Sequence, residues 1–351
     1  MFSRLFFAAA LALALVGSSQ AVEGLKKGTP AIKSAGALAF GPEGVLFVAD
    51  PVGATIFAID TGDNKPAKLL SAKIDGIDGQ IASILGTTAD QILINDMKVN
   101  PASGTPYLSV TRGKGPDAAA VLFKVTGEGK AVEVPLKDIP FAQVSIGNPN
   151  AKRPNDSVTS MAFVKGNLVV SGLTSEEWAA NLRSIPFPFT EANKGAGVQI
   201  YHGAHGKFET QAPIQTFAAY DFGGQTHLLA SYVCTPLVKI PLDSVKPGEK
   251  VKGKTIAELG NRNRPLDIVI YSKDGKDYAL IANTSRGVMK VNLAGTDTAD
   301  EITSKISDTA GLPYETIKTL AGTTQLDKLS KDQAVVLRKT DKVSLETIPL
   351  P

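Results

Sequence analysis

The chain has 351 residues, enough for one large globular core, and 37 Lys and Arg against 34 Asp and Glu give a net charge of +3 at pH 7. Such a balance creates no strong field towards nucleic acid or a membrane surface, so neither partner is expected. The single cysteine, Cys234, excludes an intramolecular disulfide, and stability must come from packing.

Residues 1–21 predict a signal peptide. Arg4 precedes an apolar run that ends at Val16, and small residues just before Val22 fit a signal-peptidase site. The run is short for a bilayer span, so an uncleaved anchor is the less favoured alternative. We therefore expect a periplasmic or secreted protein with no stable membrane span, in which residues 22–351 form a single domain.

Residues 36–60, GALAFGPEGVLFVADPVGATIFAID, read as three β-strands with Pro42 and Gly44 in the first turn. Each strand pair of this kind is followed by a third strand, and often by a weaker fourth. Similar pairs return along the chain at residues 96–111, 157–172, 215–232 and 265–283. A sixth, less regular unit is expected near the C-terminus, as is common for a terminal repeat.

Repeated units of four short strands predict an all-β fold, a β-propeller. One twisted sheet cannot bury both of its faces, whereas blades stacked around an axis bury both and leave few exposed edges. We expect six blades, with seven as the alternative, and a last blade completed by the N-terminal segment near residues 29–33.

Two segments depart from the repeat. Residues 81–94 separate the first two blades and suggest a short helix. Residues 173–197 are predicted to be a short helical insertion between the second and third strands of the third blade. Thr174 or Ser175 would cap that helix, and the following IPFPF would end it because proline cannot continue a helix.

The phrases LAFGPEGVLFVAD, MKVNPASGTPYLSV and RPNDSVTSMAF resemble the exported six-bladed β-propeller superfamily of NHL-repeat, YncE-like and SMP-30/gluconolactonase-like proteins. The resemblance concerns the fold and specifies no activity. In SMP-30-like and paraoxonase-like members, a central divalent ion held by Asp, Asn and Glu polarises a lactone or ester carbonyl. The segment RPND, residues 153–156, is similar to part of such a site.

Propeller topology also sorts the polar residues by face. The loops between second and third strands, and those between blades, lie on one face, which we call the top face. Residues that end second strands or precede first strands should therefore meet there near the axis. A polar pocket at this face, with the insertion carrying Trp178 arching over it, is the expected binding site.

Two chemistries fit a top-face pocket. Hard oxygen atoms could hold Ca²⁺, which takes six to eight oxygen ligands; the candidates are Asp50, Asp96, Asn155, Asp156, Asp267 and Asn283. Alternatively, arginines could bind a carboxylate or phosphate through paired hydrogen bonds; the candidates for ligand binding are Arg112, Arg153, Tyr232, Arg264, Arg286 and Trp178. For each residue taken singly, an Asx turn or a solvated loop arginine is the alternative.

The three histidines invite a metal interpretation. The topology places His202, His205 and His227 towards the bottom face, and Cys234 in a top-face loop remote from them, so a shared copper or zinc site is not expected. The chain contains no GxSxG, HExxH, P-loop or CxxCH motif, and no catalytic residue is identified.

Three functions remain open at this point. The first is an exported propeller that binds a small ligand, a divalent metal or a protein partner at its top face without chemistry of its own. The second is a calcium-dependent lactonase or esterase of the SMP-30 or paraoxonase-like type. The third is a scaffold whose blade surfaces serve protein contacts. The cofactor is Ca²⁺ or none, and the oligomeric state is undetermined.

Overall fold

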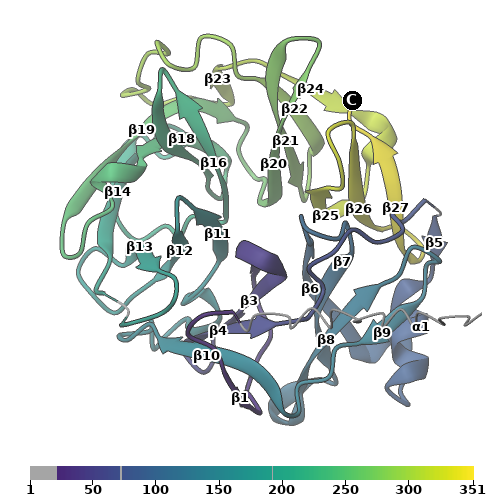
Figure 1. Ribbon diagram of the computed structural model, residues 1–351. Coiled ribbons are helices and arrows are strands. Elements are labelled where there is room, and N and C mark those ends of the chain that lie inside the picture. Colours follow the sequence, from purple (N-terminus) through teal and green to yellow (C-terminus); the bar gives the residue numbers. More distant parts are fainter. Residues whose placement is uncertain (1–21, 72, 192) are drawn as a thin grey trace, which may run out of the picture.

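The computed structural model describes residues 22–71, 73–191 and 193–351, and their strands form six blades around a central axis (Figure 1). The prediction of an all-β, six-bladed propeller is confirmed. The predicted signal peptide lies outside the described residues. Within the described ranges, no helix has the length and apolar character that crossing a bilayer requires.

The blades are numbered in chain order, and the strands of each follow one another from the axis outwards. Blade 1 contains β2 (Leu38–Phe40), β3 (Val45–Asp50), β4 (Thr55–Asp60), β10 (Ile139–Ser145) and β1 (Lys26–Gly28). Blade 2 contains β6 (Ile92–Val99), β7 (Pro106–Arg112), β8 (Ala119–Val125) and β9 (Ala131–Glu133). Blade 3 contains β11 (Ser160–Val164), β12 (Asn167–Leu173), β13 (Ala180–Pro186), β14 (Ala196–His202) and β15 (Lys207–Glu209).

Blades 4 to 6 complete the ring. Blade 4 contains β16 (Thr216–Phe222), β17 (Gln225–Ser231), β18 (Pro236–Pro241), β19 (Lys250–Leu259) and β23 (Thr309–Gly311). Blade 5 contains β20 (Pro265–Lys273), β21 (Lys276–Asn283), β22 (Gly287–Asn292) and β24 (Tyr314–Ile317). Blade 6 contains β25 (Thr323–Lys328), β26 (Gln333–Lys339), β27 (Val343–Pro349) and β5 (Ile74–Asp75). The α-helix α1 spans Ile77–Ile84 and lies beside blades 2 and 6.

The blades do not follow one another around the ring in chain order. The inner strand of blade 1 contacts those of blades 2 and 3, and the inner strand of blade 2 contacts that of blade 6. The spatial order is therefore 2, 1, 3, 4, 5, 6. After blade 2 the chain crosses back, and β10 pairs antiparallel with β4 as the fourth strand of blade 1 (Figure 1).

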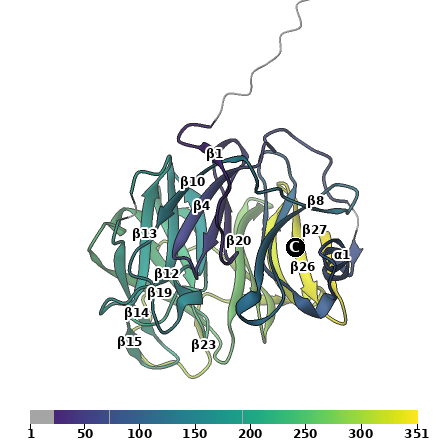
Figure 2. The ribbon, with the colours of Figure 1, turned by 90° about the horizontal axis from the view of Figure 1, so that it is seen from below.

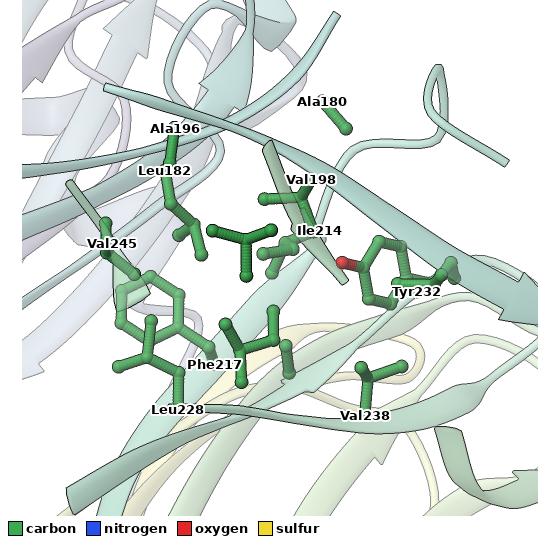
Figure 3. Packing of buried hydrophobic residues seen from close by; sticks show 14 of the residues in the cluster. Ala180, Leu182, Ala196, Val198, Ile214, Phe217, Leu228, Tyr232, Val238 and Val245 are labelled. Carbon is green, nitrogen blue, oxygen red and sulfur yellow. The ribbon is translucent and has the colours of Figure 1, made fainter. Parts of the chain in front are cut away.

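Side-chain alternation explains why a ring forms. Successive residues of a strand point to opposite faces, so each blade offers one apolar set to each neighbour. In β3, Phe47 and Ala49 pack towards blade 3, whereas Leu46 and Val48 pack towards blade 2. Similar clusters fill the gaps between the other neighbouring blades, and Figure 3 shows the one between blades 3 and 4. Because both faces are covered, the central strands can be continuously hydrophobic.

The predicted helix in residues 173–197 is wrong, because the middle of this segment, Ala180–Pro186, is strand β13. Its residues pair along the whole of β12, from Leu173↔Ala180 to Asn167↔Pro186. A helix there would have left the backbone groups of β12 unpaired on one side, which is costly inside a packed sheet. β14 is consequently the fourth strand of blade 3, not the third.

Two further expectations are corrected by the structure. The N-terminal segment does not complete the last blade: β1 pairs with β10 on blade 1, and β5 pairs with β27 on blade 6. The expected helix between blades 1 and 2 is present as α1, which begins before residue 81. Ile77 and Ile81, one turn apart, bury its apolar side.

Gly172 tests the packing that positions the loop before blade 3. A Cβ added at this residue would lie 2.1 Å from the carbonyl oxygen of Ser157, a backbone atom with little freedom to move. We expect Gly172→Ala to lower the free energy of unfolding by about 1–3 kcal/mol. At Gly79 of α1 an added Cβ meets nothing within 4 Å, so Gly79→Ala should stabilise by about 0.5–1 kcal/mol. Urea denaturation measures both, and equal effects would contradict this packing.

Candidate functional site

A cavity of about 670 Å³ opens where the top-face loops of several blades meet. Blade 1 contributes Lys33 and Ser34, which precede its first strand. Blade 1 also contributes Ala35, Gly36, Pro51 and Val52. The rest of the lining comes from other blades: Leu93, Asn95, Thr111, Gly115, Ala118, Ala119, Ala120, Asn155, Asp156, Val158, Thr159, Gln215 and Arg264. These segments end second strands or precede first strands, as the topology predicts for the top face.

A second cavity of about 100 Å³ adjoins the first, and the two share lining residues such as Asn95 and Gln215. Its wall carries three charged side chains from the innermost strands: Asp96 and Lys98 of β6, and Asp267 of β20. The polar lining therefore continues from the open top-face cavity towards the propeller axis.

Aspartate carboxylates join the inner strands of neighbouring blades. Asp96 Oδ2 accepts a hydrogen bond from the backbone N–H of Leu38 in blade 1 at 2.7 Å, and its Oδ1 accepts one from Met97 at 2.8 Å. A register shift in the β6–β7 ladder just before Asp96 marks a bulge, a feature that re-aims side chains. Each carboxylate oxygen of Asp96 is thus engaged by backbone.

The same arrangement recurs twice more. Asp267 of blade 5 accepts from Leu326 of blade 6 at 3.1 Å, and Asp327 of blade 6 accepts from Val99 of blade 2 at 2.8 Å. Each aspartate also accepts from the N–H of the residue that follows it. We call Asp96, Asp267 and Asp327 the carboxylate staples. They connect blades 5, 6, 2 and 1 in ring order.

Lys98 provides the positive charge of this network. Its Nζ lies 2.9 and 3.1 Å from the two carboxylate oxygens of Asp267, a contact across the axis between blades 2 and 5. Burial acts to lower the pKa of Lys98, but the nearby carboxylates, Asp267 first, outweigh it and raise the pKa. The side chain therefore stays an ammonium ion across the physiological range.

Burial has the opposite effect on the staples. It raises the pKa of Asp96 to about 7, against the lowering effect of Lys98, and Asp267 raises it further. Burial also raises the pKa of Asp327. Because one ammonium group faces three carboxyl groups, a proton on Asp96 near neutral pH relieves part of their repulsion.

The candidate calcium ligands do not gather around one point. Asn155 and Asp156 line the top-face cavity and Asp96 and Asp267 the smaller one, whereas Asp50 and Asn283 line neither. Among the described residues, no three of the candidate carboxylates bring oxygen atoms within 4.8 Å of one another. In the smaller cavity the Lys98 ammonium already lies at the carboxylates, where a cation would bind.

Other contacts occupy the remaining candidate oxygens. Asp50 accepts hydrogen bonds from the N–H groups of Lys33, Ser34 and Gly53, which fixes a loop. Asp156 Oδ2 forms an ion pair with Arg153, at 2.5 Å from Nη2. These contacts match the alternative in which aspartates at strand ends stabilise turns.

Of the predicted ligand-binding residues, Arg264 lines the top-face cavity. The others lie elsewhere. Arg153 pairs with Asp156, and Arg286 Nη2 pairs with Asp308 at 2.8 Å beside a different surface hollow. Arg112 ends β7 without lining the cavity, although its neighbour Thr111 does.

The two aromatic candidates have structural positions. Tyr232 is 1% exposed and packs in the apolar cluster between blades 3 and 4 (Figure 3). Trp178 packs against Gly197 of β14, and the ammonium group of Lys250 lies 5.0 Å from its ring. Trp178 therefore covers the outer strands of blades 3 and 4, and does not arch over the cavity.

Sequence reasoning missed Lys98, Asp327, Gln215 and Lys33 as site residues. Lys98 had a readable signal: in the phrase NDMKV it stands two residues after Asp96, so both side chains point to one face of a strand. Asp327 had none, because its unit near the C-terminus matches the repeat weakly.

The histidine prediction is wrong in one respect. Ligand-capable atoms of His202, His205 and Cys234 all lie within 4.8 Å of one another, so Cys234 is not remote from these two histidines. The cause is the strand count of blade 3: with β13 included, the turn after β14 leaves the sheet on the same side as the β17–β18 loop. His227 is not in this group, and its Nδ1 donates to the Gln225 carbonyl at 2.9 Å.

No family model matches the chain, and no curated protein matches it. Among solved structures, the chain is similar to a PQQ-bound aldose sugar dehydrogenase from Streptomyces coelicolor, with a TM-score of 0.35, 12% identity, and 92% of this chain and 97% of that one covered. It is also similar to a glucose dehydrogenase, with a TM-score of 0.39, 11% identity and coverage of 93% and 99%. A Bacteroides thetaiotaomicron protein of unknown function has a TM-score of 0.37, 9% identity and coverage of 92% and 72%. Similarities this weak carry no inference about ligand or activity.

Lys98→Met tests the charge network. The substitution leaves buried carboxyl groups without their counter-charge, and we expect the free energy of unfolding to fall by about 3 kcal/mol at pH 8. The loss should shrink at pH 5, where more of the carboxyl groups are protonated. Lys73→Met removes an exposed pair with Asp75 and should cost less than about 1 kcal/mol. Denaturant titrations of both variants would contradict the network if their losses were equal.

The raised pKa of Asp96 predicts a pH dependence of stability. Between the ordinary pKa of an aspartate, about 4, and the folded value, about 7, the folded chain holds a proton that the unfolded chain releases. This group's contribution to the free energy of unfolding therefore falls as the pH rises through that window, and is level above it. In Asp96→Asn the free energy of unfolding should therefore depend less on pH over this window, although the amide also has one acceptor oxygen fewer.

Urea denaturation at several pH values between 4 and 8 measures this effect as the free energy of unfolding of the wild type minus that of the variant. Asp75→Asn is the control, because Asp75 is exposed beside Lys73. If the free energy of unfolding of Asp96→Asn falls with pH as steeply as that of the wild type, another group is responsible for the pH dependence.

Proposed function

We propose that this protein is an exported β-propeller that binds a small, polar, anionic molecule in the top-face cavity. The observation that carries the proposal is the placement of Arg264 in a cavity of about 670 Å³ whose wall combines polar and apolar residues. This volume lies within the range of about 300–1,000 Å³ that small-molecule sites occupy. Export is supported by the predicted leader in residues 1–21.

The charges of the rim favour an anion. Arg264 and Lys33 both line the cavity, and no hydrogen bond or ion pair engages the Arg264 guanidinium within the described parts of the chain. The acidic group of the rim, Asp156, is already paired with Arg153. A guanidinium offers two parallel N–H donors, which match the two oxygens of a carboxylate or phosphate.

The backbone around Arg264 is fixed. Its N–H donates to Thr284 Oγ1 at 3.1 Å, its carbonyl accepts from the Thr284 N–H at 3.0 Å, and Pro265 follows it. A side chain on a fixed backbone loses less freedom when a ligand binds, which supports a recognition role.

Other polar groups of the wall divide into engaged and free. Ser34 Oγ donates to Asp50, and Thr159 Oγ1 donates to the Ile214 carbonyl. Asn155 lies exposed at the rim and is available to a ligand. Recognition would therefore rest on Arg264, Lys33 and Asn155, with the hydroxyl groups serving the fold.

The calcium-dependent lactonase alternative receives no support from the placement of its candidate ligands. Lys98 forms an ion pair with Asp267 near the axis, and backbone N–H groups occupy much of the acceptor capacity of Asp96 and Asp267. A binding function needs no further reactive group, and we propose no chemistry at this cavity.

Arg264→Gln tests the proposal. Melting temperatures of the wild type and variant are measured with a panel of di- and tricarboxylates and with inorganic phosphate, and a stabilising compound is followed by calorimetry. We expect Arg264→Gln to weaken binding by about tenfold or more, which corresponds to one charge-assisted hydrogen bond. Arg112→Gln, also exposed but outside the cavity, should bind as the wild type does. Equal losses in both variants would show only a general charge effect and would contradict the proposal.

A further inference from the structure

A second polar cluster lies on the outer side of blades 3 and 4, apart from the top-face cavity. The turn after β14 carries His202 and His205, and the loop between β17 and β18 carries Cys234. The imidazole nitrogen and thiol sulfur atoms of these three residues lie within 4.8 Å of one another. In the side view of Figure 2, β14 and β15 lie beside β19 at the edge of the disc.

Glu209 orients both imidazole rings. Nδ1 of His202 lies 2.8 Å from one carboxylate oxygen of Glu209, and Nδ1 of His205 lies 2.7 Å from the other. A carboxylate oxygen accepts hydrogen bonds, so each ring presents the N–H of its Nδ1 to Glu209. A carboxylate on the far nitrogen of a histidine is the usual second contact of metal-binding imidazoles.

The other nitrogen of His202 has no partner. His202 is 2% exposed, and its Nε2 is buried without a hydrogen-bond partner among the described residues. With the proton held on Nδ1 by Glu209, Nε2 carries a lone pair, the form in which histidine binds a metal.

The two rings are held close together. Their centroids are 3.9 Å apart with an interplanar angle of 35°, and the Nδ1 atoms of both rings lie at the same Glu209 carboxylate. Two protonated rings at this separation would repel each other. A shared cation at Nε2 would instead make the close approach favourable.

Cys234 is positioned by its backbone. Its φ is 61°, and its N–H donates to the Asn263 carbonyl at 2.7 Å. Left-handed backbone at a residue other than glycine is maintained only when surrounding contacts enforce it. In this loop of blade 4, those contacts aim the side chain at the turn of blade 3.

A second carboxyl group, that of Glu258, lies beside the cluster. Its Oε1 accepts from the N–H of Gly203 at 2.6 Å, next to His202, and its Oε2 is buried without a partner among the described residues. This contact joins the turn that carries the histidines to β19 of blade 4.

We propose that His202, His205 and Cys234 bind a zinc-class transition-metal ion through two imidazole nitrogens and one thiolate. Two nitrogens and one sulfur suit a borderline ion such as Zn²⁺ better than Ca²⁺ or Mg²⁺, which prefer oxygen. Ligand atoms of a tetrahedral zinc site lie about 3.5 Å apart, as bond lengths of about 2.0–2.3 Å require, so binding draws the three side chains slightly together. Because half of His205 is exposed, the fourth position faces solvent.

The test uses the whole protein without its leader, reduced, stripped with a chelator and titrated with Zn²⁺ by calorimetry. Co²⁺ is a second probe, because a thiolate ligand gives a charge-transfer band and a tetrahedral site gives intense visible bands. We expect one Zn²⁺ per chain, a cobalt spectrum with a thiolate band, and a melting temperature that rises with Zn²⁺.

Three variants separate the site from adventitious binding. Cys234→Ser should weaken Zn²⁺ binding at least about tenfold and abolish the thiolate band, and His205→Gln should weaken binding similarly. His227→Gln, a histidine outside the cluster, should bind as the wild type does. Both tested ligands are partly exposed, so these variants are expected to fold without metal.

The proposal is overturned if the wild type binds no Zn²⁺, or if Cys234→Ser keeps both its affinity and its cobalt spectrum. The proposal is also overturned if His227→Gln weakens Zn²⁺ binding as strongly as His205→Gln does, because the metal would then be held by scattered surface histidines.

Discussion

The ring depends on backbone groups at the axis that its own sheets cannot satisfy. The innermost strand of each blade is a sheet edge, and an unpaired N–H buried there is costly. Asp96, Asp267 and Asp327 accept such N–H groups across the gaps between blades, and Lys98 neutralises part of the charge they bring. The apolar clusters between blades supply attraction, whereas the staples fix which strand ends meet.

The top-face cavity has a deep end near the staples and a rim formed by loops, and the two differ in how many of their polar groups are already hydrogen-bonded. Its deep end is built from side chains whose hydrogen bonds are already made, as at Asp96 and Asp267. Its rim carries groups such as Arg264 and Asn155 that lie at exposed loops. Changes at the deep end should therefore act on folding, and changes at the rim should act on ligand choice.

Much of the fold could be predicted from local pattern. Alternating apolar residues and turn residues such as Pro42 and Gly44 define the three inner strands of most blades, and the face on which Arg264 and Asn155 lie follows from strand direction alone. The calcium set failed to assemble because a strand end places a residue on a face without deciding which way its side chain points.

The outer strands could not be predicted from local sequence, since they form by pairing with strand edges that lie far away in the chain. β13 overlaps a run predicted to be a helix and is a strand because it pairs along the whole of β12. β10 joins blade 1 and β5 joins blade 6 for the same reason. The one miscounted strand in blade 3 also moved two histidines to the wrong side, which concealed their proximity to Cys234.

The return of β10 constrains how the protein is made. A nascent chain leaves the ribosome in sequence, yet blade 1 lacks its fourth strand until all of blade 2 has been synthesised. Blade 2 in turn has no partner on its other side until the C-terminal strands of blade 6 emerge. Contacts so distant in sequence form slowly and leave apolar faces uncovered in the meantime. The ring can therefore close only once blade 6 is present, and a chain truncated before blade 6 would carry two open faces.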